Sequence, residues 1–366
     1  MKRYGAALSL VAAGSLTLSA CAAANEPSGG GGGDGGSGST LSGEIAGAGA
    51  SSQAAAMEAW IAGFLEGNPD ATVTYNPIGS GGGRERFING ATPFGGTDAA
   101  LDAQELPEAK QRCNGELIEF PAYISPIAVV YNLDGVDNLR LSPQTLAGIF
   151  DQQITNWNDP AIAADNPGAR LPDLPITPVN RSDESGTTEN FLDYLSEAAG
   201  QAWPHEVSGN WPVPGGEAAQ GTSGVVNAVG AGNGTIGYAD ASRAGGLGVA
   251  RIGVGNEFVG PDPQAAARIL EASQRVPGQG EFVFTYDLAR DTTEAGTYPI
   301  VLVTYEMMCG NYEDPATAQL VRAFYDYVIS DEGQRTAQQA AGSAPLSDAL
   351  RQRYQPAVES ISGGRN

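Results

Sequence analysis

Three segments of the chain combine glycine and serine in a way that suits the binding of an anion. They span residues 47–52 (GAGASS), 79–83 (GSGGG) and 181–188 (RSDESGTT). Each is expected to follow a strand and to begin a helix. The first turn of a helix has unpaired N–H groups and a partial positive charge, so it can bind an anion. One such segment alone is usually just a helix cap, but three that converge would surround a single oxyanion.

Two charged residues sharpen this prediction. Arg181, in the third segment, can make paired hydrogen bonds to a tetrahedral oxyanion, and Asp183 would hold its guanidinium in place. Asp98 ends a short predicted strand, and its carboxylate would repel an anion that carries no proton. Phosphate carries one or two protons at neutral pH and sulfate carries none, and an unpaired buried acceptor costs roughly 1–3 kcal/mol. Asp98 is therefore predicted to select a protonated oxyanion; the alternative is that it only caps the helix that follows.

Apolar periodicity predicts the elements that position these residues. A helical stripe follows the first segment, and Ser51 or Ser52 is expected at the N-cap of that helix. Residues 72–78 and 93–97 alternate as strands with a short helix between them, which is the βαβ order of a parallel sheet. The stripe consists of Met57, Trp60, Ile61, Phe64 and Leu65.

The rest of the chain predicts a second α/β lobe and a return to the first, since 366 residues exceed one typical domain. Residues 120–133 contain two apolar runs and are expected to lead from one lobe to the other. Ser142 and Pro143 predict the start of a helix, and residues 175–180 predict a strand. An apolar strand over 298–307 and a long C-terminal helix are expected to return to the first lobe, so that the crossings form a hinge. Helices are also expected around residues 191–195 and 225–229, and a strand over residues 235–238.

The first residues resemble a bacterial lipoprotein signal. Lys2 and Arg3 precede an apolar run over residues 6–18 that is too short to span a membrane. The run ends in LSAC, so Cys21 is the predicted site of acylation; the alternative is an ordinary secretory signal with an incidental cysteine. Residues 22–39 are mostly glycine and serine and predict a flexible tether. Elsewhere no stretch approaches the roughly 18 apolar residues that a membrane span needs, so the folded part is expected to be soluble.

Charge and cysteine content limit the partners. Without Lys2 and Arg3 the chain has 17 basic and 42 acidic residues, a charge of −25, which argues against a nucleic-acid partner. An anion would have to be held by short-range donors in a dry site, since salt screens the overall charge beyond about 10 Å. With Cys21 acylated, Cys113 and Cys309 remain and suggest one disulfide; two separate buried thiols are the alternative.

Four segments resemble, in their order along the chain, the ligand loops of the phosphate-binding proteins of phosphate-specific ABC transporters. They are residues 47–52, 79–83, 95–99 (GGTDA, which contains Asp98) and 181–187. The resemblance covers most of the chain beyond residue 41, including residues 127–133, 155–160 and 235–238. It implies a phosphate site made of Ser51, Ser52, Ser80, Asp98, Arg181, Ser185, Gly186 and Thr187, with Asp183 orienting Arg181.

The same resemblance implies how these residues act. The small residues would donate hydroxyl and backbone N–H groups, Asp98 would accept the phosphate proton, and Arg181 would be the single cation near the anion. The chain departs from the family pattern at two places. Ser51 and Ser52 stand where a threonine and an aromatic residue are frequent, and Glu184 stands where glycine is frequent. Glu184 is expected to point to solvent.

The resemblance further implies a two-lobed α/β fold, the type II periplasmic-binding-protein clamshell with hinge crossovers. The predicted parts are a signal peptide (1–21), a tether (22–41), a first lobe (42–125 and 297–366) and a second lobe (126–296). The protein is expected to be a monomer, lipid-anchored outside the cytoplasm, in the periplasm or at the cell surface. It would deliver inorganic phosphate to the permease of an ABC importer, with no cofactor, no metal and no nucleic-acid partner.

Three other functions stay open. A phosphatase-like hydrolase would need a base, but His205 is the only histidine, and Ser80 and Ser185 lack the Gly-x-Ser-x-Gly motif, so the protein is predicted not to be an enzyme. A binder of another tetrahedral oxyanion is the second alternative; arsenate would enter the site and sulfate would not. A structural or adhesive surface protein is the third, and the pairing of Arg181 with Asp183 argues against it.

Overall fold

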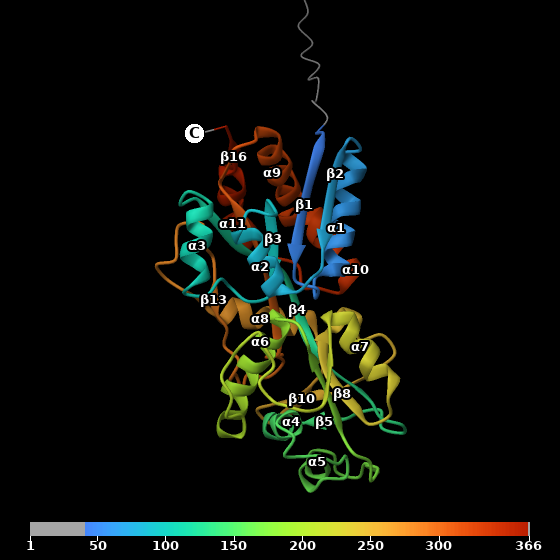
Figure 1. Cartoon of the computed structure of the whole chain (residues 1–366). Helices are drawn as coiled ribbons and strands as arrows, with labels where there is room; N and C mark the ends of the chain where they lie inside the picture. The colour runs from blue at the N-terminus through green and yellow to red at the C-terminus, as the bar shows by residue number, and fades with distance from the viewer. Residues whose placement is uncertain (1–40, 365–366) are drawn as a thin grey trace, which may run out of the picture. The chain divides into compact units, whose positions relative to one another are not determined.

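The computed structural model describes residues 41–364. The first strands of this part of the chain are parallel to one another and belong to the first lobe. They are β1 (Gly43–Gly49), β2 (Ala71–Asn76) and β3 (Phe94–Thr97). β1 lies between the other two and is parallel to both. α1 (Ala54–Gly67) joins β1 to β2, and α2 (Ser80–Ile88) joins β2 to β3 (Figure 1). The predicted βαβ order is confirmed, and α1 buries Met57, Trp60 and Phe64 of its predicted stripe.

A second group of parallel strands forms the second lobe. Its strands are β6 (Thr177–Arg181), β7 (Glu217–Ala219) and β8 (Thr235–Asp240). β6 lies between β7 and β8 and is parallel to both. α6 (Gly186–Tyr194) follows β6, and α7 (Gly221–Ala231) follows β7 (Figure 1). In both lobes, therefore, helices begin just after strands end, which is the arrangement that the sequence predicts.

Two long strands connect the lobes. β4 (Leu117–Asn132) pairs antiparallel with β14 (Val301–Cys309) along its first part and with β8 along residues 127–132. Within residues 41–364, one nine-stranded sheet runs in the order β2-β1-β3-β14-β4-β8-β6-β7, with β9 paired to β4. β4 is buried up to its last residue and β14 is buried throughout, which accounts for their long apolar runs. The predicted two-lobed α/β fold with crossovers is confirmed.

The other elements of residues 41–364 are helices, β9 of this sheet, and the strands of three smaller sheets. The helix after Ser142 begins at Pro143 as predicted, and the Ser142 Oγ accepts a hydrogen bond from the Thr145 N–H (3.4 Å). The remaining helices are α3 (Glu105–Arg112), α4 (Pro143–Phe150), α5 (Pro160–Asp165), the π-helix η1 (Leu195–Ala199), η2 (Gly200–Ala202), η3 (Ala241–Arg243), α8 (Pro263–Ala272), α9 (Pro315–Ile329), α10 (Asp331–Ala341) and α11 (Asp348–Ser360). The remaining strands are β5 (Arg140–Leu141), β9 (Gly248–Val249), β10 (Arg251–Val254), β11 (Glu257–Val259), β12 (Gln274–Arg275), β13 (Tyr286–Asp287), β15 (Asn311–Tyr312) and β16 (Ser362–Gly363).

The C-terminal region contains more helices than the sequence predicts. The expected long helix is α9, but α10 and α11 follow it. Ser330 ends α9 and caps α10, because its Oγ accepts from the Gly333 N–H (3.0 Å), and Gly342 ends α10 in a left-handed conformation. Apolar periodicity alone does not reveal these short polar breaks.

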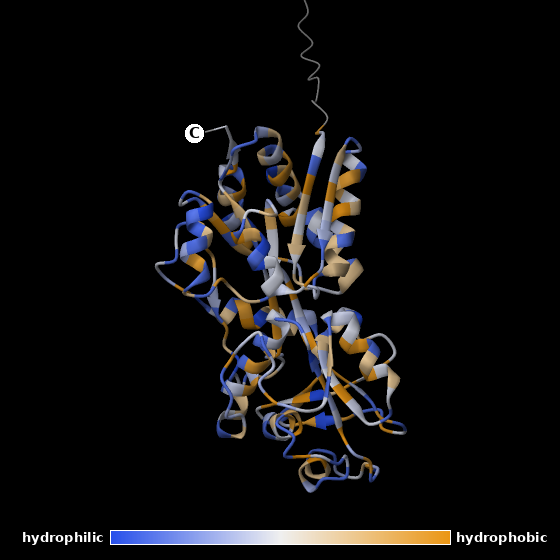
Figure 2. Cartoon of the chain, in the orientation of Figure 1, coloured by the Kyte–Doolittle hydropathy of each residue, from blue (hydrophilic) through white to orange (hydrophobic). Residues whose placement is uncertain are grey.

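Aromatic side chains fill the core of both lobes, and Figure 2 shows apolar residues along one side of several helices. In the first lobe the ring centroid of Phe94 lies 5.9 Å from that of Phe324. In the second lobe Phe191 stacks on Tyr238, with centroids 4.5 Å apart. Burying such a ring contributes about 1.5–3 kcal/mol. The Tyr238 hydroxyl extends from this core, pairs with the Thr188 hydroxyl (2.7 Å) and accepts from the Arg181 N–H (3.3 Å). The core of the second lobe thus positions the 181–188 segment.

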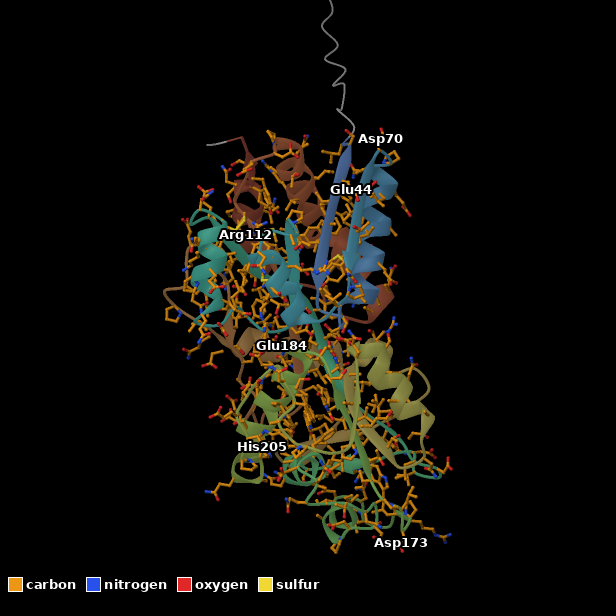
Figure 3. The ribbon with its side chains drawn as sticks, viewed as in Figure 1. Glu44, Asp70, Arg112, Asp173, Glu184 and His205 are labelled. Atoms are coloured by element: carbon orange, nitrogen blue, oxygen red, sulfur yellow. A yellow bond between two sulfur atoms is a disulfide. The ribbon has the colours of Figure 1, made fainter. Side chains whose placement is uncertain are left out.

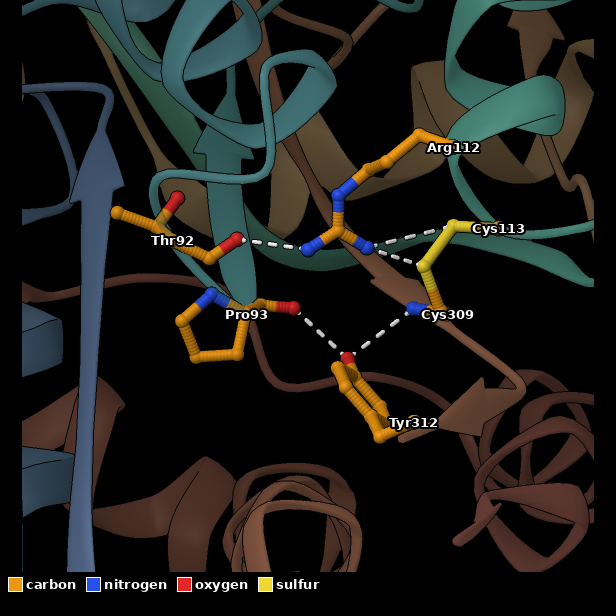
Figure 4. Close-up of a disulfide and its surroundings, with 6 residues drawn as sticks. All are labelled: Thr92, Pro93, Arg112, Cys113, Cys309 and Tyr312. Atoms are coloured by element: carbon orange, nitrogen blue, oxygen red, sulfur yellow. Dashed lines mark hydrogen bonds between the residues drawn. A yellow bond between two sulfur atoms is a disulfide. The ribbon is translucent and has the colours of Figure 1, made fainter. Parts of the chain in front are cut away.

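Cys113 and Cys309 form a disulfide, as predicted (Figure 4). It joins the residue after α3 to the last residue of β14, so both halves belong to the first lobe. The Arg112 guanidinium donates to the Cys309 Sγ and to the Thr92 carbonyl (3.0 Å) and lies 4.4 Å from the centre of the Phe87 ring. The disulfide is therefore covered by an arginine that is itself held in place.

Among the described residues no helix is both long enough and apolar enough to cross a membrane. The predicted signal peptide, Cys21 and almost all of the predicted tether lie outside the described residues.

Candidate anion-binding site

The predicted glycine- and serine-rich segments meet at the junction of the two lobes. The Gly79 N–H donates to the Gly49 carbonyl (2.9 Å), and a Cβ on Gly83 would lie only 2.4 Å from the Gly49 Cα, so glycine permits this close approach. The Gly81 N–H donates to the Glu184 carbonyl of the second lobe (3.4 Å). Residues 47–52, 79–83 and 181–188 therefore come together as predicted. The 79–83 segment is itself the first turn of α2, which begins at Ser80.

Asp98 lies at the centre of this junction and is only 2 % exposed. Its Oδ1 accepts hydrogen bonds from the hydroxyls of Ser52 (2.7 Å) and Thr304 (2.8 Å), both in the first lobe. Its Oδ2 accepts from the Thr187 hydroxyl (2.9 Å), which comes from the second lobe. Burial raises the pKa of Asp98, while these three hydroxyls and the charge of Arg181 oppose that rise. The carboxylate is therefore held mainly by neutral donors.

Arg181 lies in the second lobe and is 3 % exposed. Its Nε and Nη2 donate to the two carboxylate oxygens of Asp183 (2.8 and 2.5 Å), as predicted. Asp183 also accepts from the Gly221 N–H at the start of α7 (3.0 Å). Burial alone would raise the pKa of Asp183, but the hydrogen bond and charge of Arg181 outweigh it and lower the pKa. Asp183 stays ionised and fixes the guanidinium to the start of a helix.

Ser51 contacts the start of α7, a predicted helix whose start the sequence prediction did not include in the site. Its Oγ pairs with the Thr222 hydroxyl (3.1 Å) and accepts from the Thr222 N–H (3.2 Å), and Thr222 lies in the first turn of α7. The expectation that Ser51 or Ser52 caps α1 is wrong, because Gln53 occupies the N-cap without a side-chain cap bond. Both serine hydroxyls are turned away from α1 to other partners. The run GTS at residues 221–223, just before the predicted helix, is the signal that could have found this fourth helix start.

The start of α6 brings its small residues against the first lobe. Ser185 caps α6, since its Oγ accepts from the Thr188 N–H (3.2 Å). A Cβ on Gly186 would lie 2.7 Å from the Asp98 Cβ and 2.8 Å from the Ser80 Oγ, so only glycine allows this contact. The Ser80 Oγ accepts from the Asp98 N–H (3.1 Å). All eight predicted site residues therefore lie at one junction.

Further residues of this junction were not predicted. Thr304 and Asn190 contact Asp98, the latter through a bond from its Nδ2 to the Asp98 carbonyl (2.6 Å). Asp98 is separated from them by 206 and 92 positions, and no local pattern in the sequence joins them. The alternative that Asp98 caps the next helix is wrong, because α3 begins at Glu105.

The prediction that Glu184 points to solvent holds in part, because its side chain is 47 % exposed but its Oε1 accepts from the Arg84 Nη2 (2.7 Å). Figure 3 shows Glu184 where the two lobes meet. A second prediction about charge is wrong. Arg181 is not the single cation at the junction, since Arg84 on α2 is 5 % exposed and lies across from the 181–188 segment. Arg84 is the residue directly after the GSGGG run. The motif does not include it and therefore gives no sign of its contacts at the junction.

A cavity of about 280 Å³ borders Asp98 on another side. Its lining includes the carboxylates of Asp102, Glu189, Asp193 and Asp287. Arg290 also lines this cavity but donates to the Asp193 carboxylate (2.5 Å), so the lining keeps an excess of negative charge that disfavours an anion. Within residues 41–364, no group of three or more His, Cys, Asp or Glu side chains could hold a metal ion. His205 pairs with Asp151, the residue that follows α4 (2.6 Å).

The chain matches a family model described as the PBP superfamily domain over residues 35–332. It is 38% identical to the phosphate-binding protein PstS2 of Mycobacterium bovis over 376 aligned positions, which cover 98% of this chain and 99% of the relative. It is 33% identical to the phosphate-binding protein PstS of Xylella fastidiosa, with 81% and 80% covered.

Solved structures show the same fold. The periplasmic phosphate-binding protein PfluDING, solved with bound phosphate, matches with a TM-score of 0.70 at 23% identity, over 85% of this chain and 93% of that one. A phosphate-binding protein from Stenotrophomonas maltophilia matches with a TM-score of 0.64 at 20% identity, over 86% and 94%. The fold is thus the two-lobed periplasmic-binding-protein fold. With the family match and the near full-length similarity to its relatives, the chain belongs to the PstS family of phosphate-binding proteins within the PBP superfamily.

Proposed function

We propose that the protein binds inorganic phosphate between its two lobes and delivers it to the permease of an ABC importer. The observation that carries the proposal is the pair of buried, opposite charges, Asp98 and Arg181, placed on facing lobes among several helix starts. A guanidinium attracts the anion, and a carboxylate accepts a bond only from an anion that still has a proton. Family membership supports the same ligand.

The contacts of Asp98 suggest a different role for each of its two carboxylate oxygens. Oδ1 is held by two hydroxyls of its own lobe, and this anchors the carboxylate. Oδ2 faces the second lobe and is the oxygen that would accept the phosphate proton. Arg181 would bind phosphate while Asp183 holds its other edge. Hydroxyl and N–H groups would complete the site, from Ser51, Ser52, Ser80, Ser185, Gly186 and Thr187.

Phosphate would favour the closed arrangement, because donors from both lobes reach one ion only when the lobes meet. Micromolar affinity corresponds to about 8 kcal/mol, which several charge-assisted bonds in a dry site can supply after the cost of closure.

The chain is proposed to be a lipoprotein, with a signal peptide over residues 1–21, acylated Cys21 and a tether over residues 22–41. The first lobe would comprise residues 42–125 and 297–366, and the second lobe residues 126–296. This arrangement would hold a monomeric binding protein at the outer face of the membrane, beside its permease. Labelling with a radioactive fatty acid, lost in a Cys21→Ala variant, tests the anchor.

The protein is proposed to bind phosphate without catalysis. Phosphate, arsenate and sulfate titrated in a calorimeter provide the test of function. We expect binding of phosphate and arsenate, and no binding of sulfate. Equal affinity for sulfate would contradict the role of Asp98, and the absence of phosphate binding would contradict the function. Steady release of phosphate from a phosphomonoester by the wild-type protein, abolished in Ser80→Ala, would show an enzyme instead.

A further inference from the structure

Arg84 makes contacts in both lobes. It lies on α2 of the first lobe, and its side chain is 6 % exposed. Its Nε donates to Glu105 (2.8 Å) and its Nη1 to the Thr97 hydroxyl (3.1 Å), both in the first lobe. Its Nη2 donates to Glu184 (2.7 Å), which belongs to the 181–188 segment of the second lobe. One guanidinium is therefore anchored on one lobe and bonded to the other.

The partner residue lies between two residues of the proposed phosphate site. Glu184 separates Asp183, which orients Arg181, from Ser185, which caps α6. Its backbone carbonyl accepts from the Gly81 N–H, and a Cβ on Gly81 would lie 2.4 Å from the Glu184 Oε2. The missing side chain at position 81 thus makes room for the carboxylate. Moving Glu184 would move both neighbours.

We propose that Arg84 and Glu184 form a latch between the lobes, which stabilises the closed form and so strengthens phosphate binding. The inference rests on the proposed function for its effect on affinity, although its effect on closure does not depend on the ligand. When the lobes separate, Glu105 and Thr97 keep the guanidinium in place, so it is preorganised to receive Glu184 again.

The charges around Arg84 explain why it does not serve as a second anion-binding cation. Glu105, Glu189 and Glu184 all interact with it electrostatically. Burial raises the pKa of Glu189 to about 7, while the charge of Arg84 acts in the opposite direction. Acidic side chains thus balance this guanidinium, and removing Glu184 alone leaves it with a partner in its own lobe.

The proposed latch and simple electrostatic repulsion predict opposite effects of Glu184→Gln on phosphate affinity. A carboxylate beside an anion site repels the anion, so Glu184→Gln would tighten phosphate binding if repulsion were its only effect. If Glu184 holds the lobes closed, the same substitution weakens binding. Because the carboxylate is half exposed, we expect a loss on the order of fivefold, at the low end of typical coupling between sites.

The experiment is a double-mutant cycle with Glu184→Gln, Arg84→Gln and both together in the full chain, measured by phosphate titration calorimetry. The matched control is Glu85→Gln, which removes an exposed carboxylate from the same helix, α2, without touching the contacts of Arg84. Lobe separation is followed without phosphate by energy transfer between dyes on Asp70→Cys of the first lobe and Asp173→Cys of the second (Figure 3). Both positions are exposed.

We expect Glu184→Gln to weaken phosphate binding about fivefold and to lengthen the dye separation. The double variant should bind like Arg84→Gln alone, since the bond between the lobes is already lost in each single variant, and Glu85→Gln should leave the dye separation unchanged. High salt should lengthen the separation in the wild-type protein but not in Glu184→Gln. Unchanged or tighter binding in Glu184→Gln, with an unchanged dye separation, would overturn the latch.

The readouts separate the two proposals. A wild-type protein that binds no phosphate would contradict the proposed function, yet its dye separation would still test the latch. Arg84 is buried, so its variant can lose stability; Glu184→Gln changes a half-exposed side chain and by itself keeps the latch testable.

Discussion

Two buried guanidiniums at the lobe junction are held in different ways. Arg181 donates through its Nε and Nη2 to Asp183, which lies in the same lobe. Arg84 instead uses Nε, Nη1 and Nη2 on three different residues, one of them in the other lobe. Among the described residues, Nη1 of Arg181 has no protein partner and would be open to the proposed phosphate, whereas Arg84 has protein partners at every nitrogen. The difference teaches that burial alone does not make an arginine an anion-binding residue; the pattern of its other partners decides.

Arg181→Ala should give the largest effect and would test this comparison most directly. We expect phosphate affinity to fall by about 3 kcal/mol, more than a hundredfold, because a buried charged partner of the ligand is lost. Calorimetry measures the loss, and Arg170→Ala, at an exposed position, is the control. If Arg181→Ala bound phosphate normally, Arg181 would be no more than a structural partner of Asp183.

Asp98→Asn should change selectivity. The amide can donate to sulfate, which the carboxylate cannot, so the preference for phosphate over sulfate should fall by roughly 1–3 kcal/mol. Competition calorimetry with both anions measures this change. Asp102→Asn, an exposed neighbour, serves as the control. A variant that still rejects sulfate would place the selectivity elsewhere.

Thr304→Val should have a smaller effect of the same kind. It removes one hydroxyl from the Asp98 Oδ1 and keeps the side-chain shape, so phosphate affinity should fall by about 1 kcal/mol. The lost donor also raises the pKa of Asp98 further, so the loss should be greater at acidic pH. Titrations at several pH values, with Thr177→Val as an exposed control, would reveal it. Equal affinity at every pH would mean that Ser52 suffices to hold Oδ1.

Glu306→Gln extends the comparison to a buried carboxyl without a guanidinium partner among the described residues. Glu306 accepts from the Tyr325 hydroxyl (2.6 Å), and burial raises its pKa to about 8. Since the folded pKa lies above the unfolded value, the folded state binds more protons in between, and stability is lost as pH rises toward about 8. The variant should therefore be more stable than wild type by about 1 kcal/mol at pH 8 and less dependent on pH. Thermal unfolding from pH 5 to 8 measures this, and a parallel pH dependence in both proteins would contradict it.

Local contacts at the site could be predicted from the sequence, and distant ones could not. Arg181 and Asp183 are two positions apart, and the glycine-serine segments mark helix starts, so their roles follow from short patterns. Thr304 reaches Asp98 through strand pairing: β14 lies beside β3, and its pairing with β4 shifts register between Thr304 and Tyr305. Such a bulge redirects side chains, and no local sequence pattern predicts it.

The same limit applies to the charges. Arg84 and Glu184 are 100 positions apart, and their pairing depends on how the lobes meet. Family resemblance identified Glu184 as unusual but could not give its partner. The fold itself was easier to predict, because alternating apolar runs and helix stripes are properties of short stretches.

The disulfide has a consequence for how the protein responds to proteases. Its cysteines are separated by 196 positions, and all of β6, β7 and β8 lie between them. The second lobe is thus part of a covalent ring that is closed in the first lobe. A single cut anywhere in that ring releases no fragment, so the nicked protein should migrate as one species on a gel without reductant and split only when the disulfide is reduced.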